Sequence, residues 1–292
     1  MSLPAVSIGI PTFNRPDLLS AVVENFQNQT FQDFELIISD NASTDPRVRA
    51  VCEAAANKDR RVRCFYHDRN RGAQANFSFV YDQARGPLFM WAGDDDIWSH
   101  DFLARGIAAL RRDCSASAWF CQVVNVNLAG EPIRTLPSFR RFSSTRHKAV
   151  DLVRFLWEPE MLGKANLMHA LFRRAALVEM MDEWKAWSTS WGMDMAFVYG
   201  YLCRHRIIVE DDIVLKKRLN TSARSLDPGD PRASIYPWRE ARSYFRSYLA
   251  ASRGTGYVAL TTATLGARWL YDVGYHTGKL RRRAPLLPPA AR

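Results

Sequence analysis

The sequence contains few cysteines and no metal-binding pattern of cysteine or histidine. Its five cysteines are odd in number, and no two of them are spaced as Cys-x-x-Cys. This argues against a disulfide framework and against a zinc site. The six histidines show no metal-ligand spacing either, so none is expected to bind a metal. We expect the cysteines to be reduced residues of the core.

Long apolar runs are also missing. The longest stretch without Asp, Glu, Lys or Arg runs from Cys114 to Gly130 and is interrupted by polar residues, whereas crossing a bilayer takes about 20 predominantly apolar residues. The opening MSLPAVSIGIPTFN has no basic residue before its apolar ones and no small-residue cleavage site. We therefore expect no transmembrane span and no secretory signal, and a protein that stays in the cytoplasm.

The basic charge is concentrated in one part of the chain. A content of 47% hydrophobic and 12% aromatic residues excludes a disordered or low-complexity protein. Of the net charge of +10, the segment from Arg232 to Arg292 carries +9, because its eleven Lys and Arg face only Glu240 and Asp272. This division predicts a nearly neutral body followed by a basic extension for an anionic partner, either phospholipid or nucleic acid.

Short apolar runs alternate with single amphipathic segments in the first third of the chain. The runs predict buried strands at residues 6–10, 34–38, 62–66 and 88–91, with helices between them, the first capped by Asn14. This alternation predicts a parallel sheet with helices on both faces. Ligands of such sheets bind beyond the carboxyl ends of the strands, so the turns there are candidate sites.

The rest of the chain is less regular. We expect a helix at 102–110, one or two buried strands within 114–130, and a loop over 131–147. The remaining elements expected are helices around 152–157, 175–181 and 197–202 and a strand over 207–215.

Two of the turns that follow the strands are acidic. Asp94, Asp95 and Asp96 come directly after the fourth strand, where a bound Mg²⁺ or Mn²⁺ would remove the cost of placing like charges together. The alternative is a solvated acidic loop or a helix start with Asp96 as its cap. The turn 39–45 is also explained by a turn with a helix cap, and residues 11–15 by a helix entry in which Arg15 suggests an anionic ligand.

Four segments in order resemble family 2 glycosyltransferases, whose fold is of the GT-A type. They are VSIGIPTFNR, LIISDNASTD, NRGAQANF and FMWAGDDDIW, and the resemblance is strong over residues 5–105 and extends to about residue 225. It implies an α/β, Rossmann-like and mostly parallel sheet flanked by helices. It also implies a catalytic domain over 1–226, with a nucleotide-binding half (1–115) and an acceptor-binding half (116–226). A basic, aromatic and helical extension over 227–292 would follow.

The resemblance also implies roles for individual residues near the strand ends. The residues that match the nucleotide-binding positions are Pro11, Thr12, Asn14, Arg15, Asp40, Asn41, Asn76 and Asp94. Asn41 replaces an aspartate that many relatives place against uracil. Because an amide both donates and accepts hydrogen bonds, a CDP- or dTDP-sugar stays open beside the favoured UDP-sugar.

The metal-binding element also departs from the family pattern. Gly93 stands where the first aspartate is usual, so the resemblance assigns Mg²⁺ or Mn²⁺ to Asp95, supported by Asp96. Arg218 and Ser222 match the segment that closes over the pyrophosphate; a solvated basic loop is the alternative.

Asp194 is the candidate general base. The segment SWGMDMAF resembles the element that carries the base in inverting members of the family, with Met193 in place of a glutamate. A helix cap is the plain alternative for Asp194, and Asp211 and Asp212 are second candidates.

Aromatic residues point to an acceptor site and to a further surface. Trp187 and Trp191 are candidates for stacking on an acceptor sugar, although core packing is the commoner role of tryptophan. The aromatic residues and arginines of 232–292 fit either a helical cap on the catalytic domain or a segment that lies on an anionic membrane.

The sequence thus predicts an inverting, metal-dependent glycosyltransferase that moves a sugar from a nucleotide-diphosphate donor to a hydroxyl. The acceptor would be a glycan, a lipid-linked sugar or a metabolite, as in polysaccharide biosynthesis. A nucleotidyltransferase is an alternative, but it needs a glycine-rich phosphate loop that PTFNR does not provide. A nucleic-acid-binding protein that uses the basic extension is the other alternative.

Overall fold

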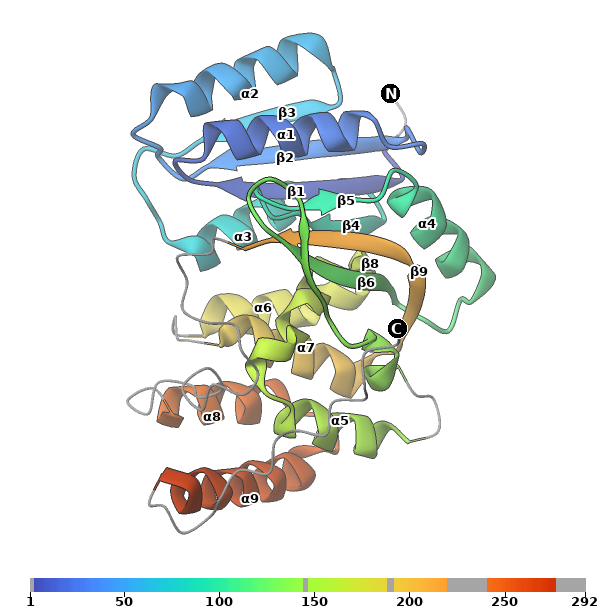
Figure 1. Ribbon diagram of the computed structural model, residues 1–292, viewed down its shortest axis with the longest axis vertical. Helices are drawn as coiled ribbons and strands as arrows, with labels where there is room; N and C mark the ends of the chain where they lie inside the picture. The colour runs from blue at the N-terminus through green and yellow to red at the C-terminus, as the bar shows by residue number, and fades with distance from the viewer. Residues whose placement is uncertain (1–2, 144–146, 188–191, 220–240, 277–292) are drawn as a thin grey trace.

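The structure is a computed structural model that describes residues 3–143, 147–187, 192–219 and 241–276. Within these residues, one mixed sheet forms the centre of the molecule (Figure 1). Most helices lie against this sheet or beside it. The C-terminal helices lie at the end of the molecule farthest from the N-terminal strands.

The N-terminal half is a parallel sheet in the order β3-β2-β1-β4. Its strands alternate with α1 (Pro16–Gln27), α2 (Pro46–Lys58) and α3 (Ala73–Asp82). All seven positions of β1 and of β2 are buried, which is the pattern of parallel strands covered on both faces. The expected parallel arrangement is confirmed here, with strands β1 (Val6–Thr12), β2 (Phe34–Asp40), β3 (Val62–Tyr66) and β4 (Leu88–Trp91).

The sheet becomes mixed beyond β4. β8 (Leu171–Arg173) pairs antiparallel with β4 and with β6 (Ala118–Val126), and β6 pairs in parallel with β9 (Ile207–Arg218). β5 (Ile97–Trp98) closes this edge by pairing antiparallel with the end of β9. This pairing brings Lys217 and Arg218, which end β9, close to the residues that follow β4.

Helices cover the second half as well. They are α4 (Phe102–Arg112), α5 (Lys148–Trp157), α6 (Val178–Ala186) and α7 (Met193–Arg204), and a 3₁₀ helix (Lys164–His169) precedes β8.

The segment 131–147 has more structure than its sequence suggests. It contains β7 (Pro132–Thr135) and a 3₁₀ helix (Phe139–Phe142). Phe139 packs edge-on against Phe120 with ring centroids 5.1 Å apart, and Phe142 packs against Phe155. The expectation of a plain loop is therefore wrong, because two buried phenylalanines anchor a segment whose arginines hide any periodicity.

Two C-terminal helices pack on helices of the second half. α8 (Ala241–Ala251) lies against α7, and α9 (Val258–His276) lies against α5 (Figure 1). The hydroxyls of Tyr199 on α7 and Thr261 on α9 are 2.7 Å apart, and Tyr244 and Tyr248 of α8 are fully buried. For the described part of the extension, packing on the domain is what the structure shows; residues 227–240 and 277–292 lie outside it. Among all the residues that the structure describes, no helix is both long and apolar enough to cross a membrane.

Candidate active site

The carboxyl ends of β1 and β4 are joined by side chains. The Thr12 hydroxyl donates a hydrogen bond of 2.8 Å to Asp94 Oδ2, and both residues are buried. Pro11 is paired with Ser39 of β2 within the sheet. The parallel register therefore brings the first turn and the acidic triplet to one edge of the sheet, where the sequence placed them.

Asn14 joins the first turn to the second acidic turn. Its Oδ1 accepts hydrogen bonds from the backbone N–H groups of Thr44 and Asp45, at 2.8 and 3.1 Å. The backbone of Asn14 is left-handed, with φ of 56°, a conformation that asparagine tolerates better than most residues. The expected cap of α1 is not formed, because Arg15 occupies the N-cap position and the Asn14 side chain points to the other turn.

The remaining nucleotide-binding candidates, at the end of β2 and on α3, form hydrogen bonds with backbone groups of neighbouring segments. Asp40 accepts from the N–H of Ser43 at 2.9 Å. The Asn41 amide is occupied by residues 70–72, since its Oδ1 accepts from Arg71 N at 2.9 Å. Asn76 is buried and donates to the carbonyl of Ser39 at 3.0 Å. In this state, these side chains shape the turns, and Asn41 does not present a free amide edge to a base.

Two positively charged side chains of the protein, Arg15 and Lys217, pair with the acidic triplet. Arg15 Nη1 lies 3.0 Å from Asp94 Oδ1 and 2.9 Å from Asp95 Oδ2. Lys217 Nζ lies 2.7 Å from Asp96 Oδ2. Burial raises the pKa of the Asp94 carboxyl, although Thr12 and Arg15 act in the opposite direction. Burial alone would lower the pKa of Lys217, but Asp96 and Asp95 outweigh it and raise that pKa.

Arg218 supports the same loop from the end of β9. Its Nη1 donates to the carbonyl oxygen of Asp95 at 3.1 Å. The other residue proposed for the pyrophosphate, Ser222, lies outside the described residues.

Gly93 leaves room for the carboxylates. A Cβ at this position would lie 2.6 Å from Asp96 Oδ2 and 3.1 Å from Asp95 Oδ1. A side chain here would require the Asp96 carboxylate to shift, and the Asp95 carboxylate to a smaller extent.

The triplet has the donor chemistry for one divalent cation. Within the described ranges, no group of three or more His, Cys, Asp and Glu side chains forms a metal-ligand set. Asp96 Oδ1 is buried without a hydrogen-bond partner in this part of the chain, and the Asp95 side chain is 26% exposed. Mg²⁺ and Mn²⁺ need only one or two carboxylates when water and substrate phosphates complete their shell. Asp95 and Asp96 fit that requirement.

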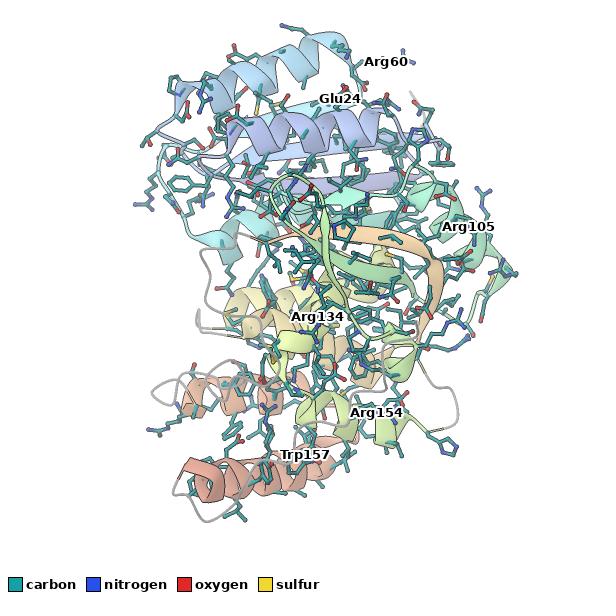
Figure 2. The ribbon with its side chains drawn as sticks, in the orientation of Figure 1. Glu24, Arg60, Arg105, Arg134, Arg154 and Trp157 are labelled. Atoms are coloured by element: carbon teal, nitrogen blue, oxygen red, sulfur yellow. The ribbon has the colours of Figure 1, made fainter. Side chains whose placement is uncertain are left out.

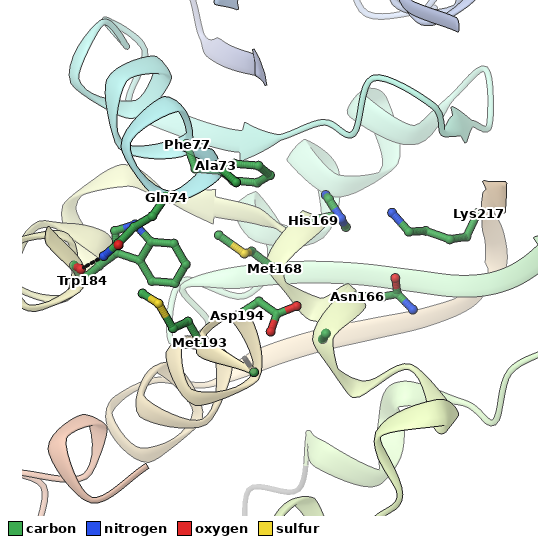
Figure 3. A pocket seen from close by; sticks show the side chains of 12 residues that line it. Ala73, Gln74, Phe77, Asn166, Met168, His169, Trp184, Met193, Asp194 and Lys217 are labelled. Carbon is green, nitrogen blue, oxygen red and sulfur yellow. Dashed lines mark hydrogen bonds between the residues drawn. The ribbon is translucent and has the colours of Figure 1, made fainter. Parts of the chain in front are cut away.

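A cavity of about 380 Å³ lies between α3, α6 and α7 and reaches the end of β9 at Lys217 (Figure 3). Lys217, which binds Asp96, lines it together with Asp194 at the start of α7. Phe77, Met168, Trp184 and Met193 form its apolar wall, and Asn166 and His169 add polar groups. The cavity thus joins residues from α3, the 3₁₀ helix at 164–169, α6, α7 and β9.

Asp194 has the surroundings of a proton acceptor. Gly192 is the N-cap of α7, so Asp194 sits in the first turn of the helix and is not its cap. Figure 3 shows its carboxylate pointing into the cavity, toward Asn166. Burial raises the pKa of Asp194, while hydrogen bonds from backbone N–H groups and the charges of Lys217 and Lys164 oppose the rise. A carboxylate with a raised pKa is a stronger base than an exposed one.

His169 was not singled out by the sequence. It lines the cavity, its Nδ1 is 3.0 Å from the carbonyl oxygen of Trp91, and burial lowers the pKa of its ring to about 3. His169 is therefore neutral at physiological pH. It lies on a short 3₁₀ helix without a motif, so no sequence signal identified it, Asn166 or Met168.

The described residues among the remaining acceptor and base candidates do not line the cavity. Trp184 lines it, whereas Trp187 packs near Trp184 with ring centroids 6.3 Å apart and is not part of the wall. Trp191 lies outside the described residues. Asp211 accepts a hydrogen bond from Ser138 at 2.8 Å, and Asp212 pairs with Arg105; neither lines the cavity.

Comparison with known proteins identifies the family. Residues 7–175, more than half of the chain, match the model of glycosyl transferase family 2. The chain belongs to this family. The match includes the first turn, the second acidic turn, the acidic triplet and the 3₁₀ helix that lines the cavity.

Curated relatives match over shorter segments. A GalNAc(5)-diNAcBac-PP-undecaprenol beta-1,3-glucosyltransferase of Campylobacter jejuni is 35% identical over 95 residues, which cover 32% of this chain and 30% of that protein. A putative teichuronic acid biosynthesis glycosyltransferase of Bacillus subtilis is 28% identical over 115 residues, which cover 39% of this chain and 45% of the relative. The matches thus span less than half of these relatives.

Solved structures share the fold across the whole chain. TarS of S. aureus, residues 1–349 in complex with UDP-GlcNAc, aligns with a TM-score of 0.55 at 16% identity and covers 95% of this chain and 93% of that one. A mannosyltransferase from Pyrobaculum calidifontis in complex with GDP-Man and Mn²⁺ aligns with a TM-score of 0.53 at 16% identity, covering 96% and 82%. The expected GT-A type of fold is confirmed, with a central α/β sheet flanked by helices.

Proposed function

We propose that this protein is an inverting glycosyltransferase that moves a sugar from a nucleotide-diphosphate donor to a hydroxyl of a glycan, a lipid-linked sugar or a metabolite. One observation carries the proposal. Lys217 binds Asp96 of the triplet and lines the same cavity as Asp194. The site for the donor phosphates and the candidate base would therefore lie on two sides of the same bound substrate.

The proposed roles follow from the contacts. Thr12, Arg15, Asp40 and Asp94 lie at the strand ends that would receive the nucleotide, and Arg218, which contacts the carbonyl of Asp95, would bind the pyrophosphate. Asp194 accepts the proton of the attacking acceptor hydroxyl, and direct displacement inverts the anomeric carbon. Neutral His169 and Asn166 orient the sugars by hydrogen bonds, and Trp184 offers an apolar surface to a sugar ring.

Asp95 and Asp96 would hold the divalent cation. When bound, such an ion neutralises charge on the departing diphosphate. Arg15 would then bind the donor phosphates in addition to Asp94 and Asp95, because its guanidinium is half exposed at the rim of the site.

The comparisons support the choice of substrates without fixing them. The structural neighbours carry a uridine and a guanosine donor, and the name of the Campylobacter relative describes an acceptor on undecaprenol diphosphate. We favour a UDP-sugar and a lipid-linked or polysaccharide acceptor. A membrane-linked acceptor would also account for attachment of residues 232–292 to an anionic membrane surface.

Thermal unfolding with UDP, CDP, GDP and dTDP, each with and without Mn²⁺, tests the proposal. A ligand that binds only the folded state stabilises it by about 2.7 kcal/mol at one hundred times its dissociation constant. We expect a metal-dependent shift with UDP that Asp95→Ala removes. The matched control, Asp82→Ala, changes an exposed carboxylate on α3 and should keep the shift.

Two outcomes would overturn the proposal. The absence of a shift with every nucleotide, together with salt-sensitive binding of single-stranded nucleic acid, would favour a binding protein. Incorporation of a nucleoside monophosphate into the product would identify a nucleotidyltransferase.

A further inference from the structure

The solvent-facing side of α9 carries no charged residue. Between Val258 and Leu270, the exposed positions hold only Val, Ala, Thr, Gly, Trp and Leu. α2 provides a comparison, because it exposes as many positions and four of them are charged, namely Arg47, Arg49, Glu53 and Lys58. A helix that faces water normally has the second pattern. We call the exposed residues of α9 from Val258 to Leu270 the α9 face.

Large apolar side chains stand out from this face. Leu270 is 64% exposed, Trp269 is 42% exposed and Val258 is 40% exposed. Trp269 and Leu265 also line a groove of about 500 Å³ between α9 and α8, together with Leu249. On the neighbouring helix α5, Trp157 is 39% exposed and packs against Tyr271 of α9. Isolated exposed apolar residues are ordinary, but several of them gathered on one helix and its neighbour indicate a binding surface.

The position of the α9 face in the molecule allows a flat partner. Among the described elements, α9 is the outermost at the end opposite to α2 (Figure 1). Trp157 lies beside it in Figure 2, so the apolar surface extends onto α5. A broad planar partner can approach this end without meeting the sheet or α1–α4.

The charge around the α9 face indicates the chemistry of its partner. Arg242 lines the groove, Arg242 and Arg246 are exposed on α8, and neither has an acidic partner in the described part of the chain. The sequence that follows α9 adds Lys279, Arg281, Arg282, Arg283 and Arg292, with no acidic residue. An apolar helix face with tryptophan, bordered by basic residues, matches the interface of a bilayer that contains anionic phospholipid.

We propose that the α9 face lies on the surface of an anionic phospholipid bilayer, with Trp269 and Leu270 inserted among the lipids. The long axis of α9 is then parallel to the membrane, and Arg242 and Arg246 contact phosphate groups. This inference extends the proposed use of a membrane-linked acceptor and rests on it for its biological purpose, but binding to lipid is measurable without any sugar transfer.

Sedimentation with vesicles tests the proposal. We expect the full-length protein to bind vesicles of phosphatidylcholine with phosphatidylglycerol at least tenfold more strongly than vesicles of phosphatidylcholine alone. Trp269→Ser/Leu270→Ser should weaken binding to the anionic vesicles by about tenfold or more, because two apolar side chains no longer enter the lipid. Leu270→Glu, a single change at an exposed position, should weaken it as well.

A matched control separates this surface from general hydrophobicity. Val178→Ser/Leu128→Ser removes two apolar side chains of similar exposure, 56% and 59%, from other parts of the surface and should leave binding unchanged. All variants should retain the nucleotide-dependent thermal shift of the wild type, so a failure of lipid binding and a failure of the proposed transferase activity are distinguishable.

Three results would overturn the proposal. These are no binding of the wild type to anionic vesicles, equal binding of wild type and Trp269→Ser/Leu270→Ser, and a dimer in light scattering that the double variant dissociates while vesicles stay unbound. The last result would assign the α9 face to a second copy of the chain.

Discussion

Two clusters of charged side chains differ in how far solvent reaches them. In the first cluster, Arg15 bridges Asp94 and Asp95 at the rim of the site, and the Arg15 side chain is 50% exposed. In the second cluster, Glu160 accepts hydrogen bonds of 2.8 Å from Arg268 and 2.7 Å from Tyr244; both partners are buried, and the Glu160 side chain is only 10% exposed.

A carboxylate oxygen without a hydrogen-bond partner among the described residues occurs next to the first cluster, at Asp96 Oδ1, and within the second, at Glu160 Oε2. An unpaired oxygen alone therefore does not mark a ligand site. The exposed cluster can exchange partners at low cost, because ion pairs near water are worth little. The buried cluster fixes the C-terminal helices against the domain, because breaking a buried pair leaves an uncompensated charge.

The second cluster also lies behind the proposed base. Tyr244 packs against Gly192, where a Cβ would lie 2.8 Å from the tyrosine ring, and Gly192 precedes Asp194 by two residues. Lys164, which donates to the carbonyl groups of Phe155 and Glu158 at 2.8 Å, begins the 3₁₀ helix that lines the cavity. The first cluster thus contains residues that can exchange ligands, whereas the second contains residues that hold the cavity in shape.

The largest expected effect is on catalysis at Asp194. Asp194→Asn should lower the rate of transfer by about 10²–10⁴, the usual contribution of a general base, and leave donor binding unchanged. Single-turnover kinetics and the nucleotide-dependent thermal shift measure the two quantities. Asp211→Asn is the control and should retain the rate. Loss of transfer in Asp211→Asn with normal transfer in Asp194→Asn would reverse the assignment.

The next effect is on stability at Glu160. Glu160→Gln should lower the free energy of unfolding by about 3–5 kcal/mol, because it removes the carboxylate that the buried Lys164 and Arg268 share and leaves Arg268 paired with Asp272, at 3.7 Å. Asp82→Asn breaks the exposed pair with Lys185 and should cost less than about 1 kcal/mol. Denaturant unfolding measures both. Equal losses in the two variants would contradict the difference between buried and exposed clusters.

Acidic pH should remove the contribution of Glu160 to the stability of the folded state. Burial raises the pKa of Glu160, but Lys164 and Arg268 outweigh it and lower that pKa below the ordinary value. The stabilisation by Glu160 is thus present above its unfolded pKa and is lost as pH falls through the folded pKa. Unfolding measured over the acidic range should show a steeper loss of stability for the wild type than for Glu160→Gln.

The pH dependence of transfer tests Asp194 in another way. Because burial raises the pKa of Asp194, the basic carboxylate is lost at a higher pH than for an exposed aspartate. The kcat/KM should fall as pH decreases through that raised pKa. Asp194→Asn should remove this acidic limb from the pH profile, and an unchanged limb in the variant would assign it to another group.

The smallest effect is expected at Arg15. Arg15→Gln should strengthen the binding of Mn²⁺ in the absence of nucleotide by roughly 1.4- to fivefold, the equivalent of a partly exposed ion pair of about 0.2–1 kcal/mol. Calorimetric titration with Mn²⁺ measures the change, and Arg47→Gln, which alters an exposed ion pair on α2, is the control. Weaker binding of Mn²⁺ to Arg15→Gln would show that Arg15 does not compete with the metal.

Local patterns were sufficient for the N-terminal half of the fold. Each parallel strand there is a short, mostly apolar run, and the first three are each followed by a helix with one apolar face, so the sequence of residues 5–105 predicts both the elements and the edge where polar turns meet. The same patterns failed at Phe139 and Phe142, whose partners Phe120 and Phe155 are distant in the sequence.

The sequence by itself determined the family, the parallel half of the sheet, the acidic turns at its edge and the basic character of the C-terminal extension. Only the tertiary structure decided that Lys217 binds Asp96, that Asn41 is occupied by a neighbouring loop, that His169 and Trp184 line the cavity, and that α9 exposes an uncharged face. The physical reason is the range of the interactions. Strand and helix patterns arise from neighbours in sequence, whereas ion pairs, cavity walls and the choice of exposed face arise from contacts between elements far apart in the chain.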